Sequence, residues 1–296
     1  QELERRCTAE LVRPPTHWWP IAIETVTNNH ERRAPGMIYG IDFPWTEKML
    51  ADFGPRWLTM AFHTAGTLNK DNSVVKIKLE EHIKVTTGNN GGKFLFEVEY
   101  AHQTPELHTK LFAKVPFPLD GATKSDRLSS SVNKQPQELW EINTYRLLEA
   151  WLPVKTPRYY FGDISNETSN WILITERVMF VDHAGMNFGK PPSQRRPPLK
   201  PFQIEGPYDK CVDYNLRGPE KEYYLLLVRT GAKMAGLYKA GKFGPGGDSV
   251  LENFGRPRAP LDAPEAWGVK PDEASGEDPD IFLKKLDVAL KFITDT

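Results

Sequence analysis

The feature that most constrains this chain is a short apolar run that carries a single lysine, at residues 111–117. Its side chains alternate in the period-two pattern of a β-strand, with Leu111, Ala113 and Val115 on one face and Phe112 and Lys114 on the other. An ammonium group in apolar surroundings is costly unless an anion meets it. The sequence therefore predicts a strand whose lysine faces a carboxylate or a bound anion.

Two alternating runs before this strand predict two more strands of the same sheet. Residues 75–80 and 93–100 each place apolar side chains on one face and charged side chains on the other. Between them lies a turn rich in glycine, which contains Gly88, Gly91 and Gly92. Short connections between successive strands favour antiparallel pairing. We therefore expect a curled antiparallel sheet.

A helical segment after Pro136 can supply the carboxylate that Lys114 needs. Glu138, Glu141, Tyr145 and Leu148 fall on one stripe at spacings of three and four residues. Because the stripe contains apolar side chains, we expect it to face the sheet. Glu141 is therefore the candidate partner of Lys114. Residues 120–134, between the strand and this helix, are expected to form a polar loop.

The N-terminal region is rich in proline, tryptophan and charge. Residues 1–45 are expected to form an arm laid over the body of the protein, with Trp18 and Trp19 as packing anchors. Residues 46–68 have the apolar spacing of one or two helices.

The second half of the chain alternates between apolar elements and long low-complexity stretches. Residues 171–176 are typical of a strand covered on both faces, and residues 219–240 predict an amphipathic helix. Residues 179–218, rich in proline and glycine, are expected to form a long loop. A final amphipathic helix is expected from residue 278 onward.

Composition excludes several classes of protein. The formal net charge of −1 creates no field that would recruit nucleic acid, and the apolar runs are shorter than the ~18 residues of a membrane span. The two cysteines, Cys7 and Cys211, are too few for a disulfide framework or a metal cluster. No signal-peptide pattern follows Gln1, so either a leader has been removed or the chain belongs to a longer product. We expect a soluble domain, in the cytoplasm or in an organelle interior after leader removal.

Four segments in order resemble landmarks of the aminoglycoside phosphotransferase and choline kinase superfamily, and of its ecdysteroid-kinase-like (CHK kinase-like) branch most closely. They are residues 87–94, 111–114, 141–145 and 172–176, and residues 225–238 are similar to the first large helix of that family's C-terminal lobe. The resemblance covers roughly residues 70–240. It implies an α+β, protein-kinase-like fold of two lobes.

The same resemblance divides the chain into four parts. It implies an N-terminal arm and helical extension at 1–69, an N-lobe of antiparallel sheet plus helix at 70–178, a long insertion at 179–218 and a partial helical C-lobe at 219–296.

The resemblance also implies an ATP site. Lys114 would contact the α- and β-phosphates, and Glu141 would hold Lys114 in place. Backbone N–H groups of Gly88, Gly91 and Gly92 would cover the phosphates, and Thr175 and Glu176 would form the hinge beside adenine. Taken singly, these features have ordinary explanations, namely a hairpin turn, a snorkelling strand lysine and a solvated helix glutamate. Their order along the chain favours a site.

Two departures from the family pattern limit the prediction of activity. Asp52-Phe53-Gly54 copies the metal-binding tripeptide of protein kinases, but it precedes the glycine-rich turn and Lys114, so we expect helix-end sequence and no metal ligand. None of the seven histidines begins the His-x-Asp triplet that would supply a catalytic aspartate. Magnesium binding is therefore expected only if a catalytic loop follows this chain.

Three kinds of protein fit these observations. The chain can be the N-terminal part of an ATP-dependent phosphotransferase that acts on a small-molecule hydroxyl. It can be a degenerate kinase-like protein, a pseudokinase, that serves as a scaffold or assembly subunit with protein partners. It can also bind a nucleotide or another small molecule for regulation. We expect no catalytic turnover from these residues alone, and the sequence does not identify the phosphoryl acceptor.

Overall fold

The structure, a computed structural model of the whole chain, describes residues 1–79, 91–178, 220–242, 244–245, 249–254 and 291. By its contacts the chain divides into two compact units, Gln1–Phe254 and Gly255–Thr296, and every helix and strand described below lies in the first. Gly88 and the expected long loop at 179–218 lie outside the described residues, as does nearly all of the expected final helix.

The described part of the chain is α+β, with a five-stranded antiparallel sheet in the order β1-β2-β3-β5-β4. The strands are β1 (Val74–Leu79), β2 (Gly92–Tyr100), β3 (Lys110–Val115), β4 (Tyr159–Ile164) and β5 (Trp171–Glu176). The alternating runs thus form the strands that the sequence predicted, and so does the apolar run at 171–176. The two-lobed, kinase-like identity of the fold remains a prediction.

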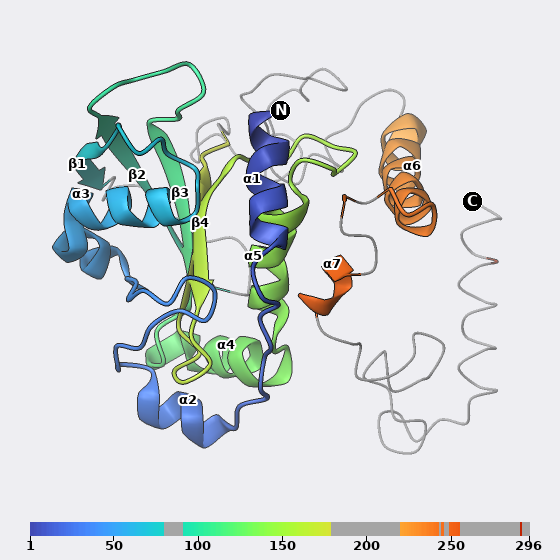
Figure 1. Cartoon of the computed structure of the whole chain (residues 1–296). Coiled ribbons are helices and arrows are strands. Elements are labelled where there is room, and N and C mark those ends of the chain that lie inside the picture. Colours follow the sequence, from blue (N-terminus) through green and yellow to red (C-terminus); the bar gives the residue numbers. More distant parts are fainter. Residues whose placement is uncertain (80–90, 179–219, 243, 246–248, 255–290, 292–296) are drawn as a thin grey trace, which may run out of the picture. The chain divides into compact units, whose positions relative to one another are not determined.

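The two faces of the sheet are covered by different helices, α3 (Glu47–Thr64) and α5 (Gln137–Leu148), which lie on opposite sides of it in Figure 1. On the α3 side, the rings of Trp57 and Phe161 meet edge to face at a centroid distance of 5.4 Å. On the α5 side, a Cβ added to Gly162 would lie only 3.0 Å from Ile142 Cγ2. The absence of a side chain at Gly162 therefore lets α5 approach β4 closely.

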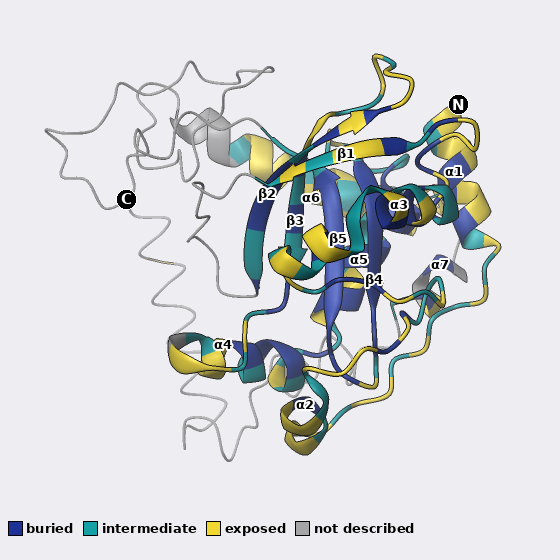
Figure 2. Cartoon of the chain, turned by 90° about the vertical axis from the view of Figure 1, so that its left-hand side faces the viewer, coloured by how far each residue is buried: buried dark blue, intermediate teal, exposed yellow. Residues whose placement is uncertain are grey.

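Burial follows position in the sheet. Every residue of β4 is buried, whereas in β1 at the other edge only Val74 is buried and the other residues are exposed or half-buried. Figure 2 shows this contrast between the two edges. The five strands together carry most of one continuous apolar core, which also includes Leu58 and Phe62 of α3.

Helix α3 bends where the kinase-like tripeptide lies. Gly54 has a φ of +71°, which few residues other than glycine adopt, and Pro55 follows it inside the helix. Asp52 is exposed, and the ring of Phe53 packs against Trp57 at a centroid distance of 5.7 Å. The expectation of helix-end sequence is confirmed, because Gly54 ends one helical segment and Pro55 begins the next.

The N-terminal arm contains two helices that the sequence analysis did not identify, α1 (Glu2–Leu11) and α2 (Ile23–Asn29). Helix α1 packs against α5. The prediction that Trp18 and Trp19 are both packing anchors is half wrong. Trp18 packs against the core and donates its Nε1–H to Gln135 Oε1 at 2.9 Å, but Trp19 is 72% exposed and is held only through its backbone.

The expected polar loop at residues 120–134 is instead helical. It contains the short turns η1 (Gly121–Thr123) and η2 (Ser129–Asn133), with α4 (Lys124–Leu128) between them. Arg127 is only 2% exposed and bonds to two polar side chains of the β4–β5 turn. The segment shows no apolar pattern because its buried side chains include polar ones, such as Arg127, Ser130 and Ser131, and Arg127 bonds to other polar groups.

Two helices complete the described residues. The predicted helix at 219–240 is confirmed as α6 (Glu220–Lys239), and a short helix that was not predicted, α7 (Ser249–Glu252), follows. Val250 of α7 packs in a small apolar cluster with Leu147 and Leu148 at the end of α5. Among the described residues, no helix combines the length and the apolar character needed to cross a membrane.

Candidate functional site

The candidate site is centred on an ion pair between Lys114 of β3 and Glu141 of α5. Lys114 Nζ lies 2.5 Å from Glu141 Oε2, and 5.7 Å from the centre of the Trp171 ring. The lysine side chain is 14% exposed and the glutamate side chain 34% exposed. The prediction that Glu141 is the partner of Lys114 is confirmed, and the pair remains open to solvent on one side.

Strand register explains why Lys114 points at α5. Lys114 pairs with Lys93 of β2 and Leu173 of β5, and residues directly opposite one another share a face of the sheet. Leu173 in turn lies opposite Gly162, the residue over which α5 packs. Lys114 and α5 therefore share a face, and the middle of the helix brings Glu141 to the ammonium group.

The described end of the glycine-rich turn lies beside this pair. Gly92 pairs with Val115, and a Cβ added to Gly91 would lie 2.5 Å from Val115 O and 2.9 Å from Trp171 Cζ2. Gly91 is thus required by close packing between strands, whatever else it does. A role of Gly91 and Gly92 in covering phosphates stays a prediction, and Gly88 is not described.

Thr175 and Glu176, the expected hinge residues, lie in β5 toward the other end of β3. Thr175 pairs with Phe112 and Glu176 with Leu111. The backbone N–H of Glu176 donates to Arg158 O at 2.7 Å. Thr175 is 4% exposed, and its hydroxyl donates to Glu176 O at 3.1 Å.

The side chain of Glu176 is also engaged by the protein. One carboxylate oxygen accepts from the backbone N–H of Arg158 at 3.1 Å, and the other lies 3.4 Å from His108 Nε2. The next N–H, that of Arg177, donates to Lys110 O at 3.1 Å. The backbone N–H groups of Glu176 and Arg177 both bond to carbonyls of the protein, so neither is available to an adenine ring in this arrangement. The hinge role of Thr175 and Glu176 stays a prediction.

A second carboxylate, Glu138, lies one turn before Glu141 and is only 5% exposed. It accepts a hydrogen bond from the hydroxyl of Ser130. Burial raises the pKa of Glu138, against the hydrogen bond from Ser130 and the positive charge of Lys114, both of which lower it. The predicted inward stripe of α5 already contained Glu138, but no sequence pattern linked Glu138 to a buried serine eight residues earlier.

Arg127 of α4, in a segment that was expected to be a polar loop, is a buried cation near Glu138. Burial lowers its pKa to about 10, while the charge of Glu138 acts in the opposite direction. Its Nη2 donates to Ser169 Oγ and Asn170 Oδ1, both at 2.9 Å, and its Nε and Nη1 have no hydrogen-bond partner in the structure as described. Two cations, Lys114 of β3 and Arg127 of α4, thus act on the two carboxylates of α5, Glu141 and Glu138.

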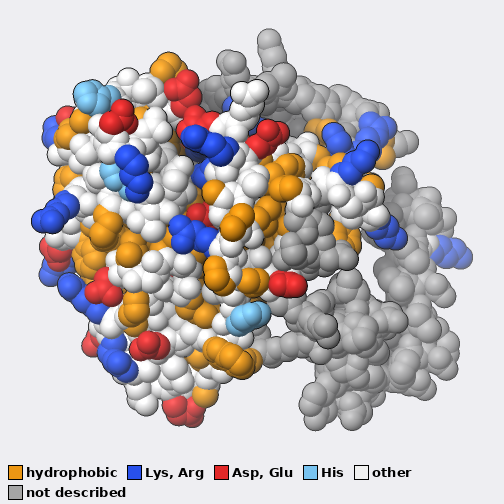
Figure 3. Space-filling view, in the orientation of Figure 1, with side chains coloured by type: hydrophobic (Ala, Val, Ile, Leu, Met, Phe, Trp, Pro, Cys, Tyr) orange, Lys and Arg blue, Asp and Glu red, His pale blue; other side chains and the backbone are white. Residues whose placement is uncertain are grey.

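Other parts of the described surface differ from this site in charge and in lining residues. On the face drawn in Figure 3, Lys and Arg side chains are interspersed with Asp and Glu among the described residues. Within the described ranges, no three His, Cys, Asp or Glu side chains gather as a metal site would require. An open hollow of ≈ 410 Å³ is lined by Gln1, Glu2, Arg5 and Asn69, none of which belongs to the site.

No protein-family model, curated protein or solved structure matches this chain. The grounds for a functional proposal are therefore the arrangement of the site and the sequence resemblance.

Proposed function

We propose that this chain is a kinase-like nucleotide-binding protein of the small-molecule phosphotransferase type, and that Lys114 binds the phosphates of ATP. The observation that supports this proposal best is the Lys114–Glu141 pair. An ammonium group has three donor hydrogens, and Glu141 needs only one of them. The others can meet phosphate oxygens without loss of the carboxylate that positions the lysine.

The activity of the parent protein, in this proposal, is ATP-dependent phosphorylation of a hydroxyl on a small molecule. These residues contain no His-x-Asp triplet, so we propose that the chain binds nucleotide without transferring phosphate. Magnesium would enter with the nucleotide phosphates, since within the described residues no three His, Cys, Asp or Glu side chains gather to hold it.

A non-catalytic scaffold or assembly subunit is the second candidate. It is favoured by α6, on which Leu226, Leu227 and Val228 are exposed although all three are large and apolar. This candidate predicts a protein partner for α6 and requires no nucleotide at Lys114.

Calorimetric titration with Mg-ATP separates the two. We expect the wild type to bind, and Lys114→Ala to bind roughly 10- to 100-fold more weakly, since hydrogen bonds to charged groups are worth about 1.5–3 kcal/mol. Lys76→Ala is the matched control, because Lys76 is also a strand lysine with a glutamate partner, Glu99 at 2.7 Å, but is exposed. It should bind as the wild type does.

Each outcome decides between the candidates. If the wild type does not bind Mg-ATP, the nucleotide-site hypothesis is wrong and the scaffold hypothesis is favoured. If wild type and Lys114→Ala bind equally well, any nucleotide site does not include Lys114. Phosphate transfer by the isolated chain to a small-molecule hydroxyl would overturn the view that the catalytic groups lie elsewhere.

A further inference from the structure

We propose that α1 is a positioning element for α5, and that Arg6 and Arg146 are positioning residues that hold Glu141 against Lys114. The proposal rests on the nucleotide-binding function proposed above. It concerns a helix far from β3 in sequence that packs against the helix carrying Glu141.

Arg6 of α1 holds the C-terminal end of α5. Its guanidinium donates to Glu149 Oε2 at 2.6 Å, to Arg146 O at 3.1 Å and to Tyr145 O at 3.3 Å. The carbonyls in the last turn of a helix have no partner within the helix. Arg6 therefore satisfies two of these carbonyls and neutralises a buried carboxylate at the same point, with both side chains at most 4% exposed.

Arg146 of α5 forms a second ion pair with α1. Its Nη1 donates to Glu10 Oε2 at 2.9 Å, and these two side chains are 1% and 5% exposed. The same guanidinium bonds to Asn143 Oδ1 and to Asn253 Oδ1, next to α7. Two reciprocal charge pairs thus fix both the rotation and the axial position of α5 against α1.

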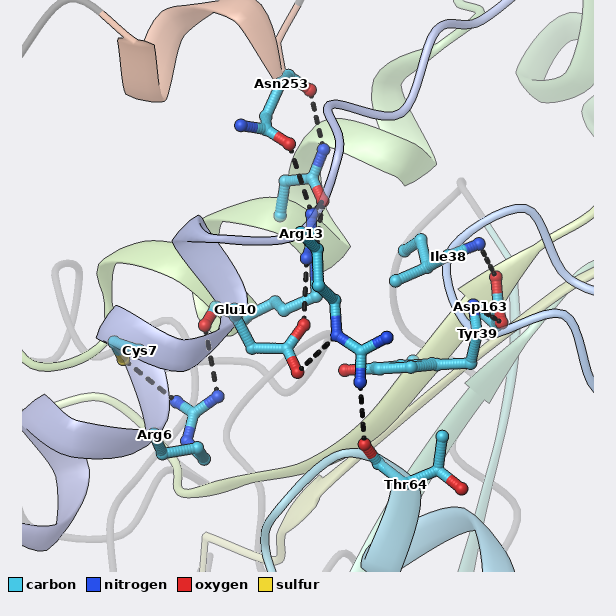
Figure 4. A network of polar contacts seen from close by, with 12 residues as sticks. Arg6, Cys7, Glu10, Arg13, Ile38, Tyr39, Thr64, Asp163 and Asn253 are labelled. Carbon is cyan, nitrogen blue, oxygen red and sulfur yellow. Dashed lines mark hydrogen bonds and ion pairs between the residues drawn. The ribbon is translucent and has the colours of Figure 1, made fainter. Parts of the chain in front are cut away.

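Helix α1 is itself anchored to the opposite face of the sheet. Arg13, just beyond α1, bonds to Glu10 at 3.1 Å and to Thr64 O, at the end of α3, at 3.2 Å. Figure 4 shows Arg13 between Glu10 and Thr64, with its guanidinium over the ring of Tyr39, 5.0 Å from the centroid. α1 therefore links the helices of both faces.

The burial of the ion pairs indicates whether the α1–α5 pairs position the Lys114–Glu141 pair or the reverse. Glu141, Tyr145 and Glu149 are spaced four residues apart and so lie along one side of α5. An ion pair with an exposed partner contributes little to stability, whereas loss of one partner from a buried pair is strongly destabilising. The half-exposed Lys114–Glu141 pair therefore adds less to the placement of α5 than the packing of Ile142 over Gly162 and the buried pairs with α1. In our proposal, the geometry of Lys114–Glu141 depends on those buried pairs.

The test is a double-mutant cycle on Mg-ATP affinity, measured well below the unfolding temperature. We expect Arg6→Met to weaken binding roughly 3- to 10-fold, and Arg6→Lys to recover part of the loss because it keeps the charge. In a Glu141→Gln background, Arg6→Met should have little further effect, because Arg6 acts through Glu141. Equal losses in both backgrounds, or wild-type affinity in Arg6→Met, would overturn the proposal.

A second measurement needs no nucleotide. Hydrogen exchange at the amides of residues 141–148 should be faster in Arg6→Met than in Val26→Ala, a buried substitution in α2, which packs on η2. Equal exchange in the two variants would refute positioning by α1, even if the wild type does not bind ATP. If Arg6→Met does not fold, Glu10→Gln takes its place in both experiments, since it weakens the second charge pair and keeps the shape.

Discussion

Helix α5 carries two kinds of ion pair that look alike in distance and differ in surroundings. Lys114–Glu141 is 2.5 Å long, and Arg6–Glu149 and Arg146–Glu10 are 2.6 and 2.9 Å long. The first is partly exposed, with its carboxylate side chain 34% accessible, whereas no partner in the other two exceeds 5%. Solvent access, and not bond length, therefore separates a pair that a ligand can enter from pairs that fasten the helix.

The largest effect is expected where one partner of a buried pair is removed. Glu149→Ala leaves the Arg6 guanidinium buried without its counter-ion, which should lower the free energy of unfolding by about 3–5 kcal/mol in urea denaturation. Burial raises the pKa of Glu149 more than Arg6 lowers it, so desolvation outweighs the attraction within the pair. The double variant Arg6→Met/Glu149→Leu should therefore lose much less. A loss under about 1 kcal/mol in Glu149→Ala would remove the distinction between the two kinds of pair.

Asp163 extends the comparison to a buried carboxylate with no cation at hydrogen-bonding distance among the described residues. Its oxygens accept from the backbone N–H groups of Ile38, Tyr39 and Ile164 at 2.9–3.0 Å. Burial nevertheless raises the pKa of Asp163 from 3.8 to about 7. Between these values the folded state holds a proton that the unfolded state releases, so stability falls as the pH rises, by about 1.4 kcal/mol per pH unit.

Asp163→Asn should remove most of this decline when unfolding is compared at pH 5 and pH 7. Asp126→Asn, at an exposed aspartate of α4, is the control and should retain the decline. An unchanged pH dependence in Asp163→Asn would mean that other groups cause the decline.

A smaller effect on stability is expected at the accessible pair. Lys114→Ala should change the free energy of unfolding by about 1 kcal/mol or less, because solvent can reach the carboxylate of Glu141 that is left behind. The same variant is expected to lose nucleotide affinity, so function and stability would separate at this residue. A loss of about 3 kcal/mol or more would place Lys114–Glu141 with the buried, fastening pairs.

The smallest effect is expected at Lys76, whose pair with Glu99 is 62% and 63% exposed. Lys76→Ala should unfold at the same denaturant concentration as the wild type, within the error of the titration. A clear shift would show that exposure alone does not rank the ion pairs of this protein.

The sequence predicted those elements whose packing follows an apolar period. The period-two runs identified β1, β2 and β3. The predicted inward stripe of α5 was partly right: Glu138 and Leu148 are buried and Glu141 and Tyr145 half-buried, on one side of the helix. It was this side that supplied the partner of Lys114. Local patterns succeed in these places because the buried side chains are mostly apolar.

The same method failed where buried surfaces are charged. The buried residues of α1 are Arg6, Cys7 and Glu10, and α4 buries Arg127, so neither helix has an apolar stripe. Their partners are remote in sequence, and a local pattern does not reveal them. The engagement of Glu176 by Arg158 and His108 was hidden for the same reason.

The pairing of α1 with α5 also has a consequence for the order of folding. Arg6 and Glu149 are separated by 143 positions, and Glu10 and Arg146 by 136. On a ribosome, Arg6 and Glu10 cannot meet their partners on α5 until residues 146–149 have been made, and closure of so long a loop is slow. Docking of α1 should then follow the rate-limiting step, so substitutions at Arg6 should mainly accelerate unfolding and leave the folding rate nearly unchanged.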